Sequence, residues 1–193
     1  MSHPCHVHDG SGIAPISGQV IDLYRECYAA PPWSETPEQL DAYPARLAAV
    51  TERAGFRAMT AHDDGGRLAG VCYGWPTPAG LTGGGLYDAL VETFGAATVA
   101  AFTRDAFEVA ELFVRPGSQG QGIGRRLLTR LTAGWPAAWL ITDPHKPAAA
   151  LYRKLGWREA GQLPAGFYPG ARLSVYALDG RHGPAVTPES RSA

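Results

Sequence analysis

Residues 108–126 constrain the fold of this chain more than any other stretch. An apolar run ends at Val114, Pro116 and Gly117 turn the chain, and an amphipathic helix begins near Arg125. Between strand and helix stand three alternating glycines: Gly120, Gly122 and Gly124. Glycines let a backbone approach a ligand closely, and the free N–H groups and dipole at a helix N-terminus favour an anion. This order of strand, loop and helix predicts a pyrophosphate-binding site.

The spacing of the glycines separates three kinds of phosphate-binding loop. A P-loop ends in Gly-Lys-Ser/Thr, whereas Gly124 is followed by two arginines. A dinucleotide-binding loop needs a further glycine three residues after its second one, and those positions hold Arg125 or Leu127. The pattern that remains is Gln119-x-x-Gly122-x-Gly124.

A second motif follows an apolar strand predicted over residues 137–141. Residues 149–157 read Ala-Ala-Leu-Tyr-Arg-Lys-Leu-Gly-Trp. Together the two motifs resemble the Gln/Arg-x-x-Gly-x-Gly/Ala loop and the Ala-x-x-Leu-Tyr-x-x-x-Gly-Phe/Trp segment of the GCN5-related N-acetyltransferases (GNAT). The resemblance spans residues 108–157 and implies that the loop holds the pyrophosphate of acetyl-coenzyme A (acetyl-CoA), the expected cofactor.

The resemblance also implies an α+β fold, in the broad α/β class, with a mixed and mostly antiparallel sheet. We expect about six to seven strands and about four flanking helices, with the sheet splayed between its fourth and fifth strands. Hydrophobic periodicity predicts helices at 17–30 and 37–53 and a hairpin of strands at 56–62 and 68–75. It also predicts a helix at 86–94 and final strands at 157–163 and 172–178.

Length and composition describe one soluble domain. The 193 residues predict a domain over 13–180 with flexible ends at 1–12 and 181–193. Three cysteines without paired spacing argue against a disulfide framework, and a net charge of −1 offers no basic field for nucleic acid. No long apolar run predicts a membrane span, so we expect a cytoplasmic protein. The His and Cys residues of the N-terminus are expected to be mobile, and no metal site is predicted.

Three residues are candidates for acid–base chemistry. The resemblance favours Glu108 as the general base, because a glutamate stands at the matching position in the histone-acetylating branch of the family. Glu111 could serve instead or bind a cationic acceptor, and the two carboxylates point to opposite faces of a strand unless a bulge intervenes. Tyr152 is the implied general acid. The alternatives are solvated strand carboxylates and a tyrosine that packs helix against sheet.

The implied cofactor contacts include the backbone of the central strand, which would pair with the pantetheine arm, and the glycine-rich loop. His145 stands where the family often has asparagine. The predicted cofactor-binding residues are Leu112, Phe113, Val114, Gln119, Gly120, Gln121, Gly122, Ile123, Gly124, Arg125, His145 and Ala150.

Aromatic residues are the candidates for the acceptor pocket, because aromatic side chains line many small-molecule sites. They are Tyr28, Trp33, Tyr73, Trp75, Phe167 and Tyr168. Residues 78–106 form an insertion that we interpret as a lid near the acceptor entrance or a contact in a possible homodimer. The predicted reaction is direct acetylation of a small primary amine, with carboxylates and aromatics favouring a cationic one. Protein or peptide acetylation and a non-catalytic acyl-CoA-binding module are the alternatives.

Overall fold

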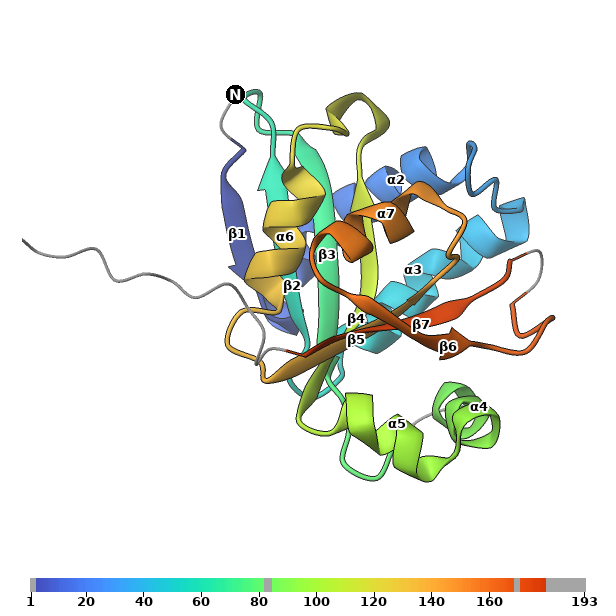
Figure 1. The fold of residues 1–193 in the computed structure, drawn as a ribbon. Helices are drawn as coiled ribbons and strands as arrows, with labels where there is room; N and C mark the ends of the chain where they lie inside the picture. The colour runs from blue at the N-terminus through green and yellow to red at the C-terminus, as the bar shows by residue number, and fades with distance from the viewer. Residues whose placement is uncertain (1–2, 82–84, 169–170, 180–193) are drawn as a thin grey trace, which may run out of the picture.

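A computed structural model describes residues 3–81, 85–168 and 171–179 (Figure 1). Its centre is a seven-stranded sheet in the order β1-β2-β3-β4-β5-β7-β6. All neighbouring strands are antiparallel except β4 and β5, which are parallel. The strands are β1 (Cys5–His8), β2 (Arg57–His62), β3 (Leu68–Pro76), β4 (Ala106–Val114), β5 (Ala137–Thr142), β6 (Arg158–Gln162) and β7 (Ser174–Asp179). The predicted fold class and strand number are confirmed.

The sheet opens between β4 and β5. These strands pair only from Ala106 opposite Ala137 to Val109 opposite Leu140, and β4 then continues to Val114 without β5 beside it. The predicted splay is therefore present. It leaves one side of the backbone of residues 110–114 free of a strand partner.

Helices cover both faces of the sheet (Figure 1). Side chains alternate along a strand, so Phe107 and Val109 belong to the core beneath α6 and α7, whereas Phe113 packs with α2 and α3 on the opposite face. The helices are α1 (Gly10–Ile13), α2 (Ser17–Tyr28), α3 (Pro37–Thr51), α4 (Gly85–Phe94), α5 (Ala96–Thr103), α6 (Ile123–Leu131) and α7 (Pro147–Lys154), with 3-10 turns η1 (Ala14–Ile16) and η2 (Pro116–Ser118). In the described residues no helix is long and apolar enough to cross a membrane.

The N-terminus differs from the prediction. Residues 5–8 form edge strand β1, which pairs with β2 from Cys5 opposite Ala61 to His8 opposite Ala58. The expectation of a flexible segment was wrong here because β1 gains backbone hydrogen bonds from a strand far away in the sequence. No cluster of three or more His, Cys, Asp or Glu that could hold a metal ion occurs in the described residues. The predicted flexible tail at 181–193 lies outside the described residues.

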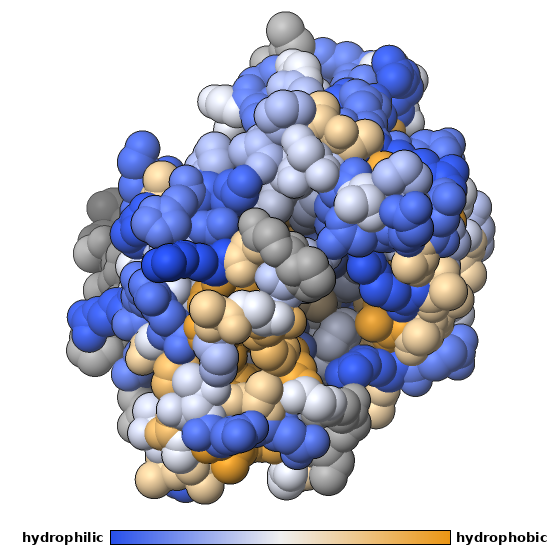
Figure 2. All heavy atoms as spheres, turned by 90° about the vertical axis from the view of Figure 1, so that its right-hand side faces the viewer, coloured by the Kyte–Doolittle hydropathy of each residue, from blue (hydrophilic) through white to orange (hydrophobic). Residues whose placement is uncertain are grey.

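The insertion is part of the core. Helices α4 and α5 cover β5 and β7 on the same face as α2 and α3, with Tyr87 and Phe102 packed near Trp139. Figure 2 shows hydrophobic residues gathered in the lower half of one side of the molecule, the level at which α4 and α5 lie in Figure 1. This packing does not support the lid interpretation, and the dimer contact stays a prediction.

Candidate active site

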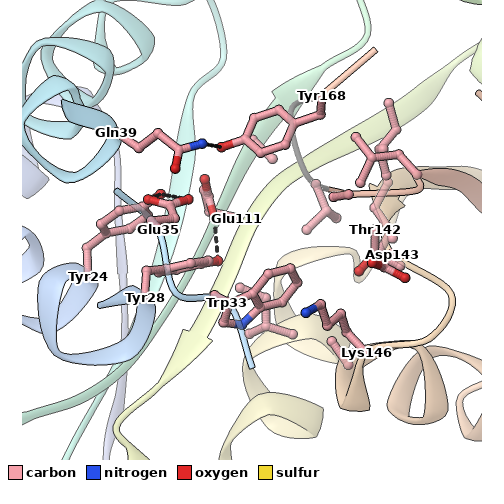
Figure 3. Close-up of a pocket in the computed structure, with 18 of the residues that line it drawn as sticks. Tyr24, Tyr28, Trp33, Glu35, Gln39, Glu111, Thr142, Asp143, Lys146 and Tyr168 are labelled. Atoms are coloured by element: carbon pink, nitrogen blue, oxygen red, sulfur yellow. Dashed lines mark hydrogen bonds between the residues drawn. The ribbon is translucent and has the colours of Figure 1, made fainter. Parts of the chain in front are cut away.

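A cavity of about 840 Å³ lies where β4 and β5 separate. Its walls come from α2, the segment joining α2 to α3, α3, β4, β5, α7 and the loop between β6 and β7 (Figure 3). Six of the residues predicted for the site line it: Glu111, Leu112, Tyr152, Tyr28, Trp33 and Tyr168. The fold therefore brings distant parts of the chain to one cavity.

A β-bulge in β4 sets the direction of the two candidate carboxylates. The register with β3 shifts between Tyr73 and Gly74, which lie opposite Glu111 and Val109, so Ala110 is the extra residue. Because of this extra residue, Glu108 and Glu111 lie on the same face of the sheet, the face of α2 and α3. A side chain at position 74 is excluded, because a Cβ there would lie 1.9 Å from the Glu108 carbonyl oxygen.

Glu111 faces the cavity. Its Oε2 accepts a hydrogen bond of 2.9 Å from the Tyr28 hydroxyl (Figure 3). Burial raises the pKa of Glu111 from 4.5 to about 7, while the Tyr28 hydrogen bond and the positive charge of Arg46 oppose that rise. A carboxyl with this pKa changes protonation near neutral pH, as a general base requires.

Glu108 does not line this cavity. Its Oε2 accepts hydrogen bonds from Trp75 Nε1 at 3.0 Å and from the Tyr87 hydroxyl at 2.5 Å. Burial raises its pKa, and these two donors and the positive charge of Arg53 oppose the rise. Glu108 thus joins the insertion to β3 and β4, and this geometry gives no support to its predicted role as the base.

Tyr152 lies on α7, where its ring is almost fully buried next to Trp157 and Tyr176 and also forms part of the cavity wall. Burial raises the pKa of the Tyr152 phenol, and the nearby Glu111 carboxylate adds to this rise. The phenol is therefore protonated across the physiological range and is available as a proton donor.

The glycine-rich loop joins β4 to α6. Gly120 and Gly122 have φ angles of 77° and 73°, in the left-handed region that suits glycine. Gly122 is the N-cap of α6, and no side chain caps this helix. Within the described structure the N–H groups of residues 120–122 donate to no other protein group. The Gln119 side chain bonds to the Val114 carbonyl at 3.1 Å and fixes the loop to the strand end.

Comparison with known proteins identifies the family of this chain. The model of the acetyltransferase (GNAT) domain matches residues 55–159, more than half of the chain. The chain belongs to the GNAT family. An uncharacterized protein of Mycobacterium leprae is 36% identical over 75 residues, which are 37% of this chain and 21% of that protein, so the chain spans only a part of this relative.

Two solved GNAT structures have the same fold. The ribosomal-protein-S18-alanine N-acetyltransferase of Escherichia coli is 17% identical, with a TM-score of 0.60 over 92% of this chain and 93% of that one. A phosphinothricin acetyltransferase of Sinorhizobium meliloti, solved with acetyl-CoA, is 20% identical, with a TM-score of 0.58 over 99% of this chain and 95% of that one. The predicted family and fold are confirmed, and the two neighbours act on a protein and on a small molecule.

The GNAT loop and splay fit the cofactor of this family. The unpaired N–H groups at the start of α6 can donate to phosphate oxygens, and the free edge of residues 110–114 can pair with amide groups of an extended arm. Gly124 lies close to this edge, since a Cβ there would be 3.7 Å from Val114 and 3.4 Å from Leu151. Arg125, His145 and Ala150 are exposed and outside the cavity, and their predicted contacts stay predictions.

Two of the predicted acceptor residues lie in the core of this GNAT domain instead. Tyr73 is buried, with its hydroxyl 3.3 Å from that of Tyr43, and Trp75 is held by Glu108 and by Arg53, which stacks 4.3 Å from its ring centroid. Neither lines the cavity at β4 and β5. Phe167 is partly exposed and is also absent from the cavity wall.

Sequence reasoning missed several polar residues that line the cavity. They are Tyr24, Glu35, Gln39, Arg46, Asp143 and Lys146. Four of them lie on α2, on α3 or between these helices. The spacing of the sequence motifs does not show in which direction these side chains point. The available signal was the predicted helix at 37–53, whose residues were not assigned to a cavity or to solvent.

Proposed function

We propose that this protein transfers an acetyl group from acetyl-CoA to a primary amine of a small molecule, with Glu111 as the general base. The observation that carries this proposal is the position of Glu111 in the cavity beside the splay, with a pKa raised to about 7. At neutral pH a substantial fraction of this carboxyl is ionised and can accept a proton from the acceptor ammonium group.

The reaction needs one bond to form and one to break. The amine nitrogen, once deprotonated, attacks the thioester carbonyl carbon, and the carbon–sulfur bond then breaks. Acetyl-CoA supplies the activated acyl group, which the loop at 119–124 and the free edge of β4 would hold at the cavity. Tyr152 is the residue we assign to protonating the leaving thiolate, because its phenol belongs to the cavity wall and is protonated.

A hydrogen bond between two walls of the cavity favours a small acceptor. Gln39 Nε2 donates a hydrogen bond of 3.1 Å to the Tyr168 hydroxyl, which connects α3 to the β6–β7 loop across the cavity (Figure 3). A protein substrate would need an open groove for the residues that follow its amino group. A small amine needs no such groove.

The test is release of free thiol from acetyl-CoA in the presence of a panel of small amines and of peptides with free N-termini. We expect turnover with small amines and little with peptides. Glu111→Gln should bind acetyl-CoA by calorimetry as well as the wild type does while losing turnover. Binding without turnover for every amine and peptide would favour the acyl-CoA-binding module, and preferential turnover of peptides would favour the protein acetyltransferase.

A further inference from the structure

A second carboxylate lies on the acceptor side of the cavity. Glu35 belongs to the segment between α2 and α3 and lines the cavity together with Glu111. Its backbone N–H donates to the Tyr28 carbonyl at 2.9 Å, and both of its carboxylate oxygens lie 2.9 Å from the Tyr24 hydroxyl. Figure 3 shows its side chain beside Tyr24 on the same side of the cavity as Glu111. The position of this carboxylate is therefore fixed by the protein.

Glu35 keeps most of its hydrogen-bonding capacity. A carboxylate offers about four lone-pair sites, and the single phenol proton of Tyr24 fills one of them. The nearby cation Arg46 donates to the Tyr24 oxygen at 2.7 Å, and its guanidinium carbon lies 5.7 Å and 5.5 Å from the ring centroids of Tyr24 and Tyr43. Arg46 is thus bound to the tyrosine and forms no ion pair with Glu35. An acceptor could supply the missing cation.

The other cation of the cavity is also engaged. Lys146 donates to the Pro32 carbonyl oxygen and lies 5.6 Å from the centroid of the Trp33 ring. Asp143 adds a third carboxylate to the wall, where it accepts the backbone N–H of His145 at 2.9 Å. The cavity therefore has more carboxylates than cations, next to aromatic rings that can contact an ammonium group.

We infer that the acceptor is a small molecule with two amino groups, one that reacts beside Glu111 and a second that Glu35 binds as an ammonium ion. This inference rests on the proposed acetyltransferase function and specifies its substrate class. A monoamine would leave the Glu35 carboxylate without a directly hydrogen-bonded cation, whereas a diamine forms a charge-assisted hydrogen bond there. Glu35 is thus a specificity-determining residue and takes no part in the proton transfers.

Acceptors of matched shape test this inference. In the thiol-release assay we would compare 1,3-diaminopropane, 1,4-diaminobutane and 1,5-diaminopentane with butylamine and with 4-aminobutanoate. For the wild type we expect the best diamine to exceed butylamine in kcat/KM by about tenfold or more, because a hydrogen bond to a charged group contributes about that factor. The anionic 4-aminobutanoate should be the poorest acceptor. Equal use of butylamine and all three diamines would overturn the inference.

Variants at position 35 connect the preference to this residue. Glu35→Gln should raise KM for the best diamine about tenfold and change KM for butylamine much less, so that the preference for the diamine is lost. Glu35→Lys should reverse the order, so that 4-aminobutanoate becomes a better acceptor than the diamine. The matched control is Glu38→Gln, which removes a carboxylate that is exposed and outside the cavity. If both glutamine variants behave alike, Glu35 does not bind the acceptor.

The outcome separates two failures. If no amine releases thiol, the proposed function fails, whatever Glu35 does. If amines are acetylated and Glu111→Gln abolishes this, but the position-35 variants leave the acceptor order unchanged, the function stands and only the diamine inference fails. A circular-dichroism melt of each variant shows whether it is folded before its kinetics are compared.

Discussion

The surroundings of Glu108 and Glu111 differ although both carboxylates lie on one strand and one face of the sheet. Burial raises the pKa of each. In the core, one carboxylate oxygen of Glu108 accepts hydrogen bonds from two donors, Trp75 and Tyr87. At the wall of the cavity, Glu111 accepts a hydrogen bond from a single donor, Tyr28. A buried carboxylate whose partners are all protein groups holds elements together, and one that faces a cavity is able to meet a ligand.

Burial serves a different purpose at each of the two carboxylates. Glu108 connects the insertion to the centre of the sheet, since Tyr87 belongs to α4 and Trp75 to β3. Glu111 lies beyond the bulge, where β4 no longer pairs with β5. The same chemical group therefore joins two elements at one position and faces a cavity three residues later, where we propose that it acts as the base.

The largest expected effect distinguishes these two positions directly. Glu111→Gln should lower kcat/KM for an accepted amine by about a hundredfold to a thousandfold, because the general base is lost. Glu108→Gln should lower it by less than about tenfold in the same assay, since this residue lies outside the cavity. The measurement is initial-rate thiol release with both variants at equal acetyl-CoA saturation. A reversed order would return the role of base to Glu108.

A smaller loss is expected at the proposed acid. Tyr152→Phe should lower kcat by about a hundredfold while KM for acetyl-CoA changes little, because only the proton for the leaving thiolate is removed. The matched control is Tyr176→Phe, which removes a hydroxyl from a neighbouring ring 6.2 Å away that does not line the cavity. Equal losses in both variants would mean that these tyrosines act through packing.

The sequence predicted more of the fold than of the site. The hydrophobic periodicity of residues 37–53 and the glycine-rich loop are local patterns, and the structure has α3, with a capping box at Thr36 and Gln39, and α6 where they indicate them. Edge strand β1 and the bulge at Ala110 depend on pairing with distant strands, which no local pattern reports. The direction of Glu108 and Glu111 follows from that bulge, so sequence alone could name both carboxylates but could not place them in different surroundings.

Glu108 is expected to contribute to the stability of the fold. Glu108→Gln should lower the free energy of unfolding by about 1–3 kcal/mol, because it weakens the acceptor of two buried hydrogen bonds. Tyr87→Phe should lower it by a similar or smaller amount, since it removes one donor of the same pair. Chemical denaturation followed by tryptophan fluorescence measures both, with Glu38→Gln as a surface control. Unfolding curves that match the wild type would mean that Glu108 does not hold the insertion to the sheet.

The smallest expected effect is a shift in the pH profile. Activity requires ionised Glu111, so kcat/KM of the wild type should rise as the pH increases through about 7, the raised pKa of this carboxyl. The Tyr28 hydrogen bond stabilises the ionised form and lowers the pKa. Its removal in Tyr28→Phe should therefore move the rising limb to higher pH, by up to about one unit.

The acceptor amine titrates as well, so both profiles must be recorded with one acceptor, and only the difference between them reports on Glu111. Glu108 provides the counterpart to this experiment. Tyr87→Phe removes a donor from Glu108, yet it should leave the limb in place because that carboxyl exchanges no proton with the acceptor. The opposite result would be a rising limb of the pH profile that moves in Tyr87→Phe and stays fixed in Tyr28→Phe. It would show that Glu108, and not Glu111, is the base.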